Sequence, residues 1–533
     1  MSGDESSVDA DSTDGANAES ARSDQALRDL VKGAGTIYGG LIAEVVIAFL
    51  AQVLAARYLS SSGFGGVTTG TAVLNLGAIL SGLGLRRGLT RYLPRVKDRE
   101  KSAIAWRALL LGGAVSVVVA ASVVLGAKLV VGRLLGGEDV VATVVIFGAG
   151  IPAATLLSIS IGGIRGQKRS RYRVYVENIL RPISRFVLVA AAVAYGLGEV
   201  GIAGAYMLPY VLGGIVALWL FRRTLPSGGE VPRTERTSFR SILRYSVPFV
   251  ISRGTGFIYR SIDIFLVLYF IDSSAVGVYG VAYAAARLML MFSTAFNYLG
   301  APLASELDAS GDDEGMIRVH YTMLRWLVVV SVPALVPFVL FPSAFVTAIY
   351  GSTYATGASA LAVLAVGFAV HNVASAQGNL LEAKGESDVL AFNSAISAVT
   401  NVVLNLLLIP QYGILGAAIA TVAAYLAIDG LLLVEFDRIL DRWPLPRSVL
   451  APVIIALPLF AGVTFIRSIV PETLLWIVLT SGVFALVYAA FVTVVLGVRP
   501  AELMLLQSVE ERFGVDLGPV MRLAEYLVRP QQK

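Results

Sequence analysis

The sequence predicts an all-α polytopic membrane protein with about fourteen transmembrane helices. Of the 533 residues, 56% are hydrophobic and only 15% are charged, whereas a soluble chain carries roughly a quarter charged residues. Long apolar runs recur almost to the end of the chain. These runs are too long for strands and lack an alternation with a period of two. The composition therefore excludes a soluble globular enzyme, a disordered scaffold and a fibrous protein.

The first 32 residues differ in kind from the rest. Acidic residues outnumber basic ones there, and small polar residues fill the remaining positions. This composition is typical of a disordered, solvated segment. A secretory signal is not expected, because a basic start followed by a cleavage site is missing. Residues 1–32 are therefore predicted to be a disordered acidic cytoplasmic tail.

The transmembrane helices follow from a window of roughly 20 apolar residues, the length that crosses the hydrocarbon core. Twelve or thirteen spans are the alternatives to fourteen. The windows that meet the criterion lie near 36–56, 67–85, 108–130, 141–163, 179–197, 201–221, 246–270, 275–299, 326–342, 358–381, 391–409, 414–434, 449–466 and 474–496.

The distribution of Lys and Arg orients these spans. With the N-terminus inside, the outer loops hold only Arg57, Lys128, Arg133 and Arg467 of the 42 basic residues, and most of the others fall in inner loops. Basic residues accumulate on the cytoplasmic side of membrane proteins. We therefore expect a multi-pass protein of the cell (cytoplasmic) membrane with both termini cytoplasmic. The same bias explains the formal charge of +5, so nucleic acid is not expected as a partner.

An internal repeat divides the chain. Residues 59–65 resemble 271–277, and residues 201–205 resemble 413–417. Both matches have an offset of 212 residues and occur at the same place in the order of spans. Two six-span copies in the same orientation, related by an axis along the membrane normal, are typical of transporters. Duplication that only builds a stable bundle is the alternative.

The repeat gives the expected organisation of the chain. An N-lobe (33–223) carries spans 1–6, a cytoplasmic linker (224–242) follows, and a C-lobe (243–435) carries spans 7–12. Spans 13 and 14 (449–496) are appended. Residues 499–533 are too polar to span, and their apolar residues alternate with charged ones. This segment is predicted to be an amphipathic cytoplasmic tail at the membrane surface, with a frayed soluble tail as the alternative.

Several motifs carry a family resemblance over roughly residues 30–496. The most specific is Leu408-Ile409-Pro410-Gln411-Tyr412-Gly413, which continues as Ile414-Leu415-Gly416-Ala417. Further matching segments are 55–59 with 63–65, Tyr245-Ser246-Val247-Pro248, and Val276-Gly277-Val278-Tyr279. The chain resembles polysaccharide-biosynthesis flippases of the multidrug/oligosaccharidyl-lipid/polysaccharide (MOP) exporter superfamily.

This resemblance implies a V-shaped transporter with two lobes that works by alternating access. It also implies a polyprenyl- or dolichyl-linked oligosaccharide as cargo, for surface polysaccharide or glycoprotein assembly. Drug exporters share the fold, and a fold alone does not select a cargo. The alternative is therefore an ion-coupled exporter of drugs or other small molecules.

Charged residues inside the predicted spans are the candidates for function. Five of them are selected: Glu44 in span one, Arg253, Arg260 and Asp263 in span seven, and Arg287 in span eight. A charge at mid-bilayer is costly, so such residues generally face a water-filled cavity or a partner. Arg253 and Arg260 are two helical turns apart and share a face, and Arg260 can pair with Asp263.

The excess of cations favours an anionic cargo. Arginine binds phosphate oxygens in a bidentate manner, so Arg253, Arg260 and Arg287 are expected to bind the substrate headgroup. Asn75, which the 212-residue offset aligns with Arg287, is also expected to bind the headgroup. Asp263 and Glu44 position these cations or bind a coupling ion, and Na⁺ and H⁺ are both open. The alternative is a local Arg260–Asp263 ion pair, with Arg253 reaching the inner interface.

The remaining polar residues are interpreted as structural. His371 and Asn372 are expected to form a satisfied buried polar pair, and Asp429 is expected at the membrane interface. Cys is absent and His occurs only twice, so a metal site is not expected. No cofactor is expected, and the chain is interpreted as a transporter in contact with membrane lipids, not an enzyme. The acidic cluster at 308–314 is assigned to a solvated turn.

Overall fold

A computed structural model describes residues 43–135, 137–226, 238–294, 311–467, 469 and 471–497. The predicted tails 1–32 and 499–533 lie outside the described residues. So do the first residues of span one, most of the linker and the end of span eight. Within the described residues the backbone is helical and contains no strand.

The first half of the chain folds into one bundle of helices, here called the N-terminal bundle. Residues 43–58 are helical and precede it. A π-helical turn, Lys128–Leu134, extends the third long helix, and another, Val174–Leu180, leads into the fifth. The helices are α2 (Ser61–Ser81), α3 (Leu85–Tyr92), α4 (Asp98–Ala127), α5 (Val141–Ala149), α6 (Ile151–Gly166), α7 (Ser170–Arg173), α8 (Arg181–Ala194) and α9 (Gly198–Thr224).

The second half forms the C-terminal bundle. It is followed by the helix pair α19 (Arg447–Arg467) and α20 (Leu474–Leu496), which packs on α14. The other helices are α10 (Phe239–Ser246), α11 (Pro248–Phe270), α12 (Ser273–Ala286), α14 (Asp313–Ala334), α15 (Val336–Val339), α16 (Pro342–Tyr350), α17 (Ala358–Ala383) and α18 (Ser387–Leu440).

Predicted spans eleven and twelve form one helical element, α18, with a sharp break at Gly413. Gly413 has φ 58° and ψ −137°, a conformation that is readily available only to glycine. The chain reverses there. Asn393 donates to Glu435 at 2.6 Å, and the Ser397 hydroxyl donates to the Ala424 carbonyl at 2.7 Å. The two segments therefore lie antiparallel.

Nine helices in the described part of the chain are long and apolar enough to cross a membrane. The number fourteen is not established, although the described part of every predicted span is mainly helical. Many exposed side chains are apolar, for example Leu110 (68% exposed), Leu125 (83%) and Leu486 (74%). Apolar exposure on this scale indicates contact with lipid. The chain is a multi-pass membrane protein.

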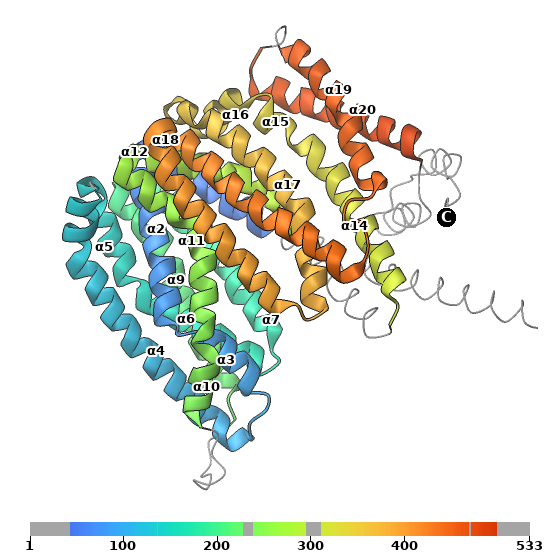
Figure 1. Ribbon diagram of the computed structural model, residues 1–533. Coiled ribbons are helices and arrows are strands. Elements are labelled where there is room, and N and C mark those ends of the chain that lie inside the picture. Colours follow the sequence, from blue (N-terminus) through green and yellow to red (C-terminus); the bar gives the residue numbers. More distant parts are fainter. Residues whose placement is uncertain are drawn as a thin grey trace, which may run out of the picture.

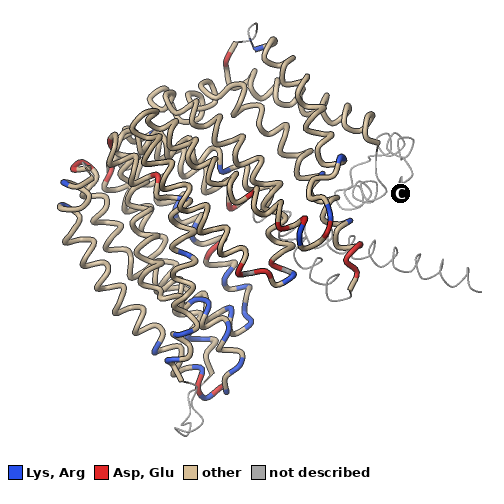
Figure 2. The backbone as a smooth tube through the Cα atoms, in the orientation of Figure 1, with Lys and Arg blue, Asp and Glu red and all other residues tan. Residues whose placement is uncertain are grey.

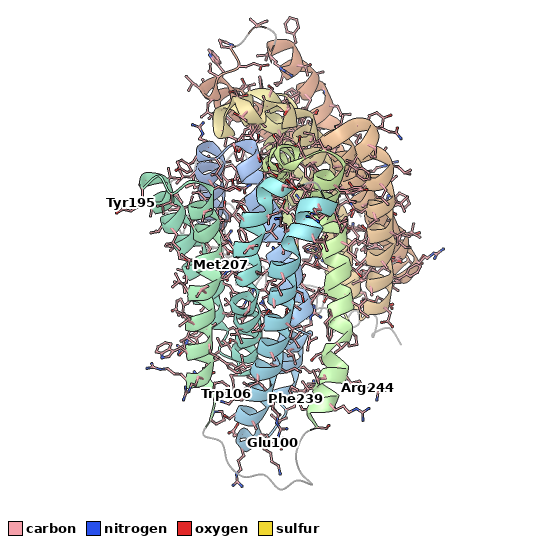
Figure 3. All side chains as sticks on the ribbon, turned by 90° about the vertical axis from the view of Figure 1, so that its left-hand side faces the viewer. Glu100, Trp106, Tyr195, Met207, Phe239 and Arg244 are labelled. Carbon is pink, nitrogen blue, oxygen red and sulfur yellow. The ribbon has the colours of Figure 1, made fainter. Side chains whose placement is uncertain are left out.

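The two bundles meet where α2 packs on α12 (Figure 1). Toward the other end α17 and α18 diverge from the N-terminal bundle, whereas α10 stays packed on α3. Helix α11 lies between the bundles, with α2 on one side and α18 on the other. Figure 2 shows Lys and Arg gathered around α3 and α10, at the end opposite the contact of α2 with α12. Figure 3 places Glu100 and Arg244 at that same end, opposite Tyr195.

The contact between α2 and α12 obeys the 212-residue offset. The two helices begin with equivalent caps, in which Ser60 accepts from Gly63 and Asp272 accepts from Ala275. The hydroxyls of Ser61 and Ser274 are 2.6 Å apart, and those of Ser62 and Ser273 are 2.9 Å apart. Each pair is the symmetry equivalent of the other, as in an isologous interface.

Candidate functional site

A tyrosine-lined surface in the C-terminal bundle carries two of the predicted arginines. The Arg260 Nη2 and Nε donate to the Tyr259 hydroxyl at 2.8 and 3.1 Å. The Tyr259 ring meets Tyr425 edge to face, with centroids 5.8 Å apart. The charges of Arg260 and Arg287 both reach Tyr283 and Tyr425. We call Tyr259, Arg260, Tyr283, Arg287 and Tyr425 the arginine–tyrosine surface.

Both arginines on this surface are solvent-exposed although they lie in predicted spans. A guanidinium inside a membrane protein is stable where water or an anion can reach it. The aromatic rings contribute negatively polarised faces and, through their hydroxyls, hydrogen bonds that hold the arginines in place. The surface therefore offers two positioned cations to an anionic ligand.

Asp263 does not pair with Arg260, which corrects the expected ion pair. Its carboxylate, 2% exposed, accepts hydrogen bonds from the Tyr279 hydroxyl and, at 3.2 Å, from Thr421. The backbone N–H of Ile264 donates to its other oxygen at 3.0 Å. Tyr279 lies on α12 and Thr421 on α18, so Asp263 joins three helices of the C-terminal bundle.

Arg253 belongs to a different group, which we call the Glu177 cluster. Arg86 forms a two-pronged ion pair with Glu177 (2.9 and 3.1 Å), and Arg173 adds a third contact at 2.9 Å. The charges of Arg86, Arg87 and Glu177 reach both Arg253 on α11 and Arg165 at the end of α6. The Glu177 cluster comprises Arg86, Arg87, Arg165, Arg173, Glu177 and Arg253.

Glu177 precedes the predicted span 179–197. Burial by itself would raise the pKa of this carboxyl, but the charge and hydrogen bonds of Arg86 and Arg173 outweigh it and lower the pKa below its usual value. Glu177 is therefore a carboxylate at neutral pH. Two arginines contact this carboxylate, two more lie within reach of its charge, and the charge of Arg87 acts on those two, so the cluster is positive overall.

The contacts of Glu44 lie outside the arginine–tyrosine surface. Glu44 accepts a hydrogen bond from Asn178, and its charged neighbours are Arg181, Glu177 and Arg173. It therefore lies beside the Glu177 cluster. Asn75 is exposed on α2. The predicted site residues are thus divided between two places: Arg260 and Arg287 at one, and Arg253 with Glu44 at the other.

Sequence reasoning missed several residues of these groups. Arg86, Arg87, Arg165 and Arg173 were assigned to cytoplasmic loops by their charge alone. Tyr259 and Tyr425 carry no signal beyond being aromatic residues in apolar spans. The unusual number of arginines near 86–95 and 165–173 could have indicated a functional cluster.

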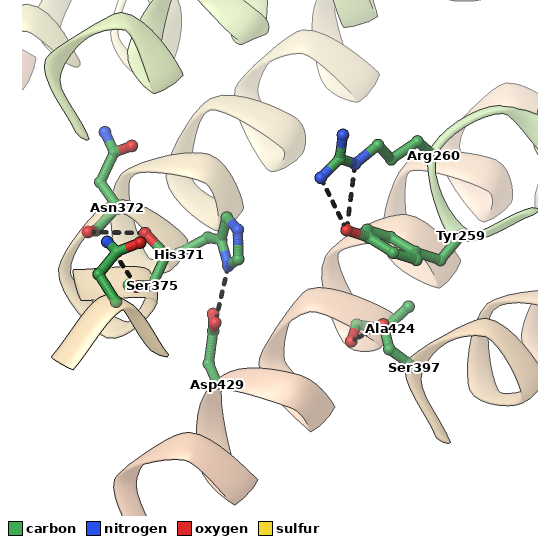
Figure 4. A network of polar contacts seen from close by, with 9 residues as sticks. Tyr259, Arg260, His371, Asn372, Ser375, Ser397, Ala424 and Asp429 are labelled. Carbon is green, nitrogen blue, oxygen red and sulfur yellow. Dashed lines mark hydrogen bonds and ion pairs between the residues drawn. The ribbon is translucent and has the colours of Figure 1, made fainter. Parts of the chain in front are cut away.

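Two expectations are corrected. Asp429 is buried inside the protein, and the partner of His371 is Asp429 and not Asn372. Asp429 is 3% exposed and its Oδ1 lies 2.7 Å from His371 Nδ1. Asn372 does not pair with His371 but donates to the Met289 carbonyl. Figure 4 shows the Asp429 carboxylate directed at the His371 ring. Asp429 is buried because α17 and α18 pack along their length, which hydropathy alone does not reveal.

These features define a class of protein. Two helical bundles, related by an internal repeat, carry cationic groups within their predicted spans. Solved transporters of the MOP superfamily share this fold. Residues 30–307 match the family model described as polysaccharide biosynthesis protein. Because the match covers more than half of the chain, the chain belongs to this family.

Comparisons with known proteins agree with this assignment. The chain is 25% identical to the probable flippase AglR of Haloferax volcanii, over 76% of this chain and 82% of AglR. It is 26% identical to the probable low-salt glycan biosynthesis flippase Agl15 of the same organism. That match covers 35% of this chain and only 39% of Agl15.

Two solved structures share the fold. The inward closed conformation of the lipid II flippase MurJ aligns with a TM-score of 0.66 at 12% identity, over 86% of this chain and 99% of MurJ. An inward-facing multidrug-resistance MATE transporter of the MOP superfamily aligns with a TM-score of 0.62 at 16% identity, over 74% of this chain and 94% of the transporter. At these identities the likeness concerns the fold alone.

Proposed function

We propose that this protein translocates a lipid-linked oligosaccharide across the cytoplasmic membrane. The lipid is of the polyprenyl- or dolichyl-phosphate type, and the product serves surface polysaccharide or glycoprotein assembly. The observation that carries this proposal is the pair of exposed arginines, Arg260 and Arg287, held on one tyrosine-lined surface within the spans. A phosphate or diphosphate headgroup matches the planar fork of arginine.

The Glu177 cluster supports the same cargo. It combines five arginines with one carboxylate, at the end of the molecule where basic residues gather (Figure 2). By the positive-inside rule this end is cytoplasmic, and both termini are assigned to that side. An anionic headgroup arriving from the cytoplasmic leaflet meets this cluster first and then the arginine–tyrosine surface. Arg253, on α11, lies on that route.

Alternating access would use the two bundles as rocking lobes, 33–223 and 243–435, joined by the linker 224–242. The contact of α2 with α12 closes the end opposite the basic cluster, while α17 and α18 diverge from the N-terminal bundle at the basic end and only α10 and the start of α11 stay packed near α3. We assign this arrangement to an inward-facing state. Translocation then requires this contact to open and the other end to close. The lipid tail remains in the bilayer while the headgroup moves between the lobes.

Asp263 is assigned to coupling and not to the binding of the headgroup. It is buried and bound by Tyr279 and Thr421, which lie on two other helices. A carboxylate at such a junction changes the packing of three helices when it is protonated or binds Na⁺. Glu44, beside Asn178, positions the cations of the N-terminal bundle. Asn75 remains a proposed headgroup contact on α2.

The relatives' names point in the same direction, because AglR and Agl15 are described as probable flippases. The alternative is an ion-coupled exporter of small organic molecules with the same fold. Its supporting observation is the pair of half-buried rings Tyr259 and Tyr283, backed by the buried Tyr425, which could bind organic cations. The two arginines on the same surface oppose a cationic substrate, so the anionic cargo is preferred.

The test uses a deletion strain complemented with wild type, Arg260→Gln or Arg287→Gln. The amount and leaflet of lipid-linked oligosaccharide and the glycosylation of surface proteins are measured. We expect each variant to lose at least tenfold in export and to leave the lipid-linked glycan on the cytoplasmic side. Arg438→Gln, at an exposed position at the end of α18, is the matched control and should export normally. Unchanged glycans with a loss of drug resistance would establish the exporter instead.

A further inference from the structure

We propose that His371 and Asp429 form a proton-binding site that is coupled to the anion-binding surface, so that binding of the anionic headgroup is accompanied by uptake of a proton. The proposal rests on the proposed function, because it assumes that Arg260 and Arg287 bind an anion. The proposed proton acceptor is distinct from Asp263. Anion binding and proton uptake are proposed to favour each other.

The pair has the geometry of a proton-sharing couple. His371 Nδ1 and Asp429 Oδ1 are 2.7 Å apart, and they join α17 to α18. The second carboxylate oxygen of Asp429 is buried and has no hydrogen-bond partner. A buried carboxylate with one free oxygen and an adjacent imidazole has few ways to satisfy its charge other than a proton on the pair.

The pair touches the arginine–tyrosine surface through one residue. The His371 ring lies 4.3 Å from the Tyr425 ring, centroid to centroid. Tyr425 in turn meets Tyr259, which accepts the hydrogen bonds of Arg260. In Figure 4, the His371–Asp429 and Arg260–Tyr259 pairs appear together in one close view. The side chain of His371 is 18% exposed, which leaves its ring a path for proton exchange.

The charged surroundings of the pair are simple. Among the described groups, His371 is the only one whose charge acts appreciably on Asp429. Arg260 on α11 and Arg287 after α12 act on Tyr425, together with Tyr259 and Tyr283. The other elements packed against α17 bring titratable or charged groups that have partners or packing elsewhere. These are His320, stacked on Phe436; Arg325, bonded to the Gly497 carbonyl; Tyr354, bonded to the Ala56 carbonyl; and Tyr350, packed on Phe49.

The direction of coupling follows from charge. Without an anion, the charges of Arg260 and Arg287, which act on Tyr425, disfavour an extra positive charge on the His371 imidazole that packs against Tyr425. A bound headgroup cancels that effect, because its negative charge offsets the guanidinium groups. The protonated form of the His371–Asp429 pair is then stabilised relative to the unprotonated form. By linkage, an anion that promotes protonation must itself bind more tightly when the pair is protonated.

The experiment is calorimetric titration of the purified full-length protein with farnesyl diphosphate. It is repeated near pH 6.5 in buffers of different ionisation enthalpy, which gives the number of protons taken up. Wild type should take up a measurable fraction of a proton for each diphosphate bound. His371→Gln and Asp429→Asn should still bind and should lose this uptake. Asp429→Asn keeps a hydrogen-bonding group beside the ring, so a folded protein is expected.

The matched control is His320→Gln, because His320 is the only other histidine in the chain and stacks on Phe436 in α18. It should retain the uptake. Binding without proton uptake in wild type, or uptake that persists in His371→Gln and Asp429→Asn, would overturn the inference. Absence of binding, or binding unaffected by the Arg260→Gln, Arg287→Gln double variant, would overturn the proposed anion surface itself. The two failures are therefore distinguishable.

Discussion

Gly65 and Gly277, which are 212 residues apart, occupy equivalent positions in the contact between α2 and α12. A Cβ on Gly65 would overlap the carbonyl oxygen of Ser273, and a Cβ on Gly277 would overlap that of Ser61. Each glycine thus admits the backbone of the other half of the molecule. This reciprocity is the clearest structural trace of the internal repeat, and it places the closed end of the transporter at a two-fold contact.

A side chain at either glycine should therefore open this end. We expect Gly65→Ala or Gly277→Ala to weaken the contact by about 1–3 kcal/mol, the usual cost of overpacking. A change of about 1.4 kcal/mol alters the ratio of two states tenfold. The readout is the rate of maleimide labelling of Ser61→Cys, which has no background because the chain contains no cysteine.

Gly204→Ala is the control for the glycine prediction, because a Cβ at Gly204 meets nothing within 4 Å. It should leave the labelling rate unchanged. Equal labelling rates in the Gly65→Ala, Gly277→Ala and Gly204→Ala backgrounds would show that the contact does not govern access to this end.

A disulfide across the same contact should arrest the cycle. Ser61 and Ser274 are joined by their hydroxyls at 2.6 Å, so cysteines at both positions should cross-link on mild oxidation. We expect the oxidised Ser61→Cys, Ser274→Cys protein to bind the headgroup but not to translocate it. Translocation should return on reduction. Either single-cysteine variant should be insensitive to the oxidant, and full activity of the cross-linked protein would contradict alternating access through this contact.

Asp263→Asn separates coupling from binding. Because Asp263 is bonded to Tyr279 and Thr421 and not to Arg260, we expect the variant to bind farnesyl diphosphate with an affinity within about threefold of wild type. Glycan export in the deletion strain should fall at least tenfold. A large loss of binding would instead restore the expected Arg260–Asp263 partnership. Tyr279→Phe, which removes one donor to the carboxylate, should have an intermediate effect on export.

The Glu177 ion pairs should confer stability with a defined pH dependence. The lowered pKa of Glu177 means that its contribution is present above the ordinary carboxyl pKa and is lost as the pH falls through the folded value. We expect Glu177→Gln to cost about 1–2 kcal/mol of unfolding free energy, because the pairs with Arg86 and Arg173 are partly exposed.

The measurement for Glu177 is thermal unfolding of wild type and Glu177→Gln in detergent. Their difference should be constant between about pH 5 and 7 and should shrink below about pH 4, near the ordinary carboxyl pKa. A difference that grows as the pH falls would have the wrong sign for a carboxylate stabilised by arginines. Glu472→Gln, which removes the exposed partner of Arg467, should show almost no difference at any pH.

The helices and the repeat could be predicted because hydropathy and offset are local properties of the sequence. For example, the reversal at Gly413 could be expected because Pro410 and Gly413 lie between two apolar runs. The side-chain partners could not be predicted in this way. Arg260 and Asp263 are close on one helix, but Tyr279 and Thr421 approach Asp263 from two other helices and take its oxygens.

The same limit explains the two groups of arginines. Charge counting assigns Arg86, Arg165 and Arg173 to loops, because each lies near the end of an apolar run. Their convergence on Glu177 depends on how α3, α6 and the turn before α8 pack, and a single sequence carries no direct record of that packing. Asp429 is a similar case. A charged residue near the end of a predicted span is expected at the membrane interface, and only the packing of α17 on α18 brings His371 beside it.

The centre of the contact between α2 and α12 is built from small groups: two glycines that admit backbone, and serine hydroxyls that bond in pairs. Asp139 accepts from two of these serines, Ser62 and Ser273. Each hydrogen bond between two hydroxyls is worth only about 1 kcal/mol net, and water can replace it when the surfaces part. Because water can satisfy each hydroxyl that separation exposes, the serine pairs hold the two halves in register without fixing them together.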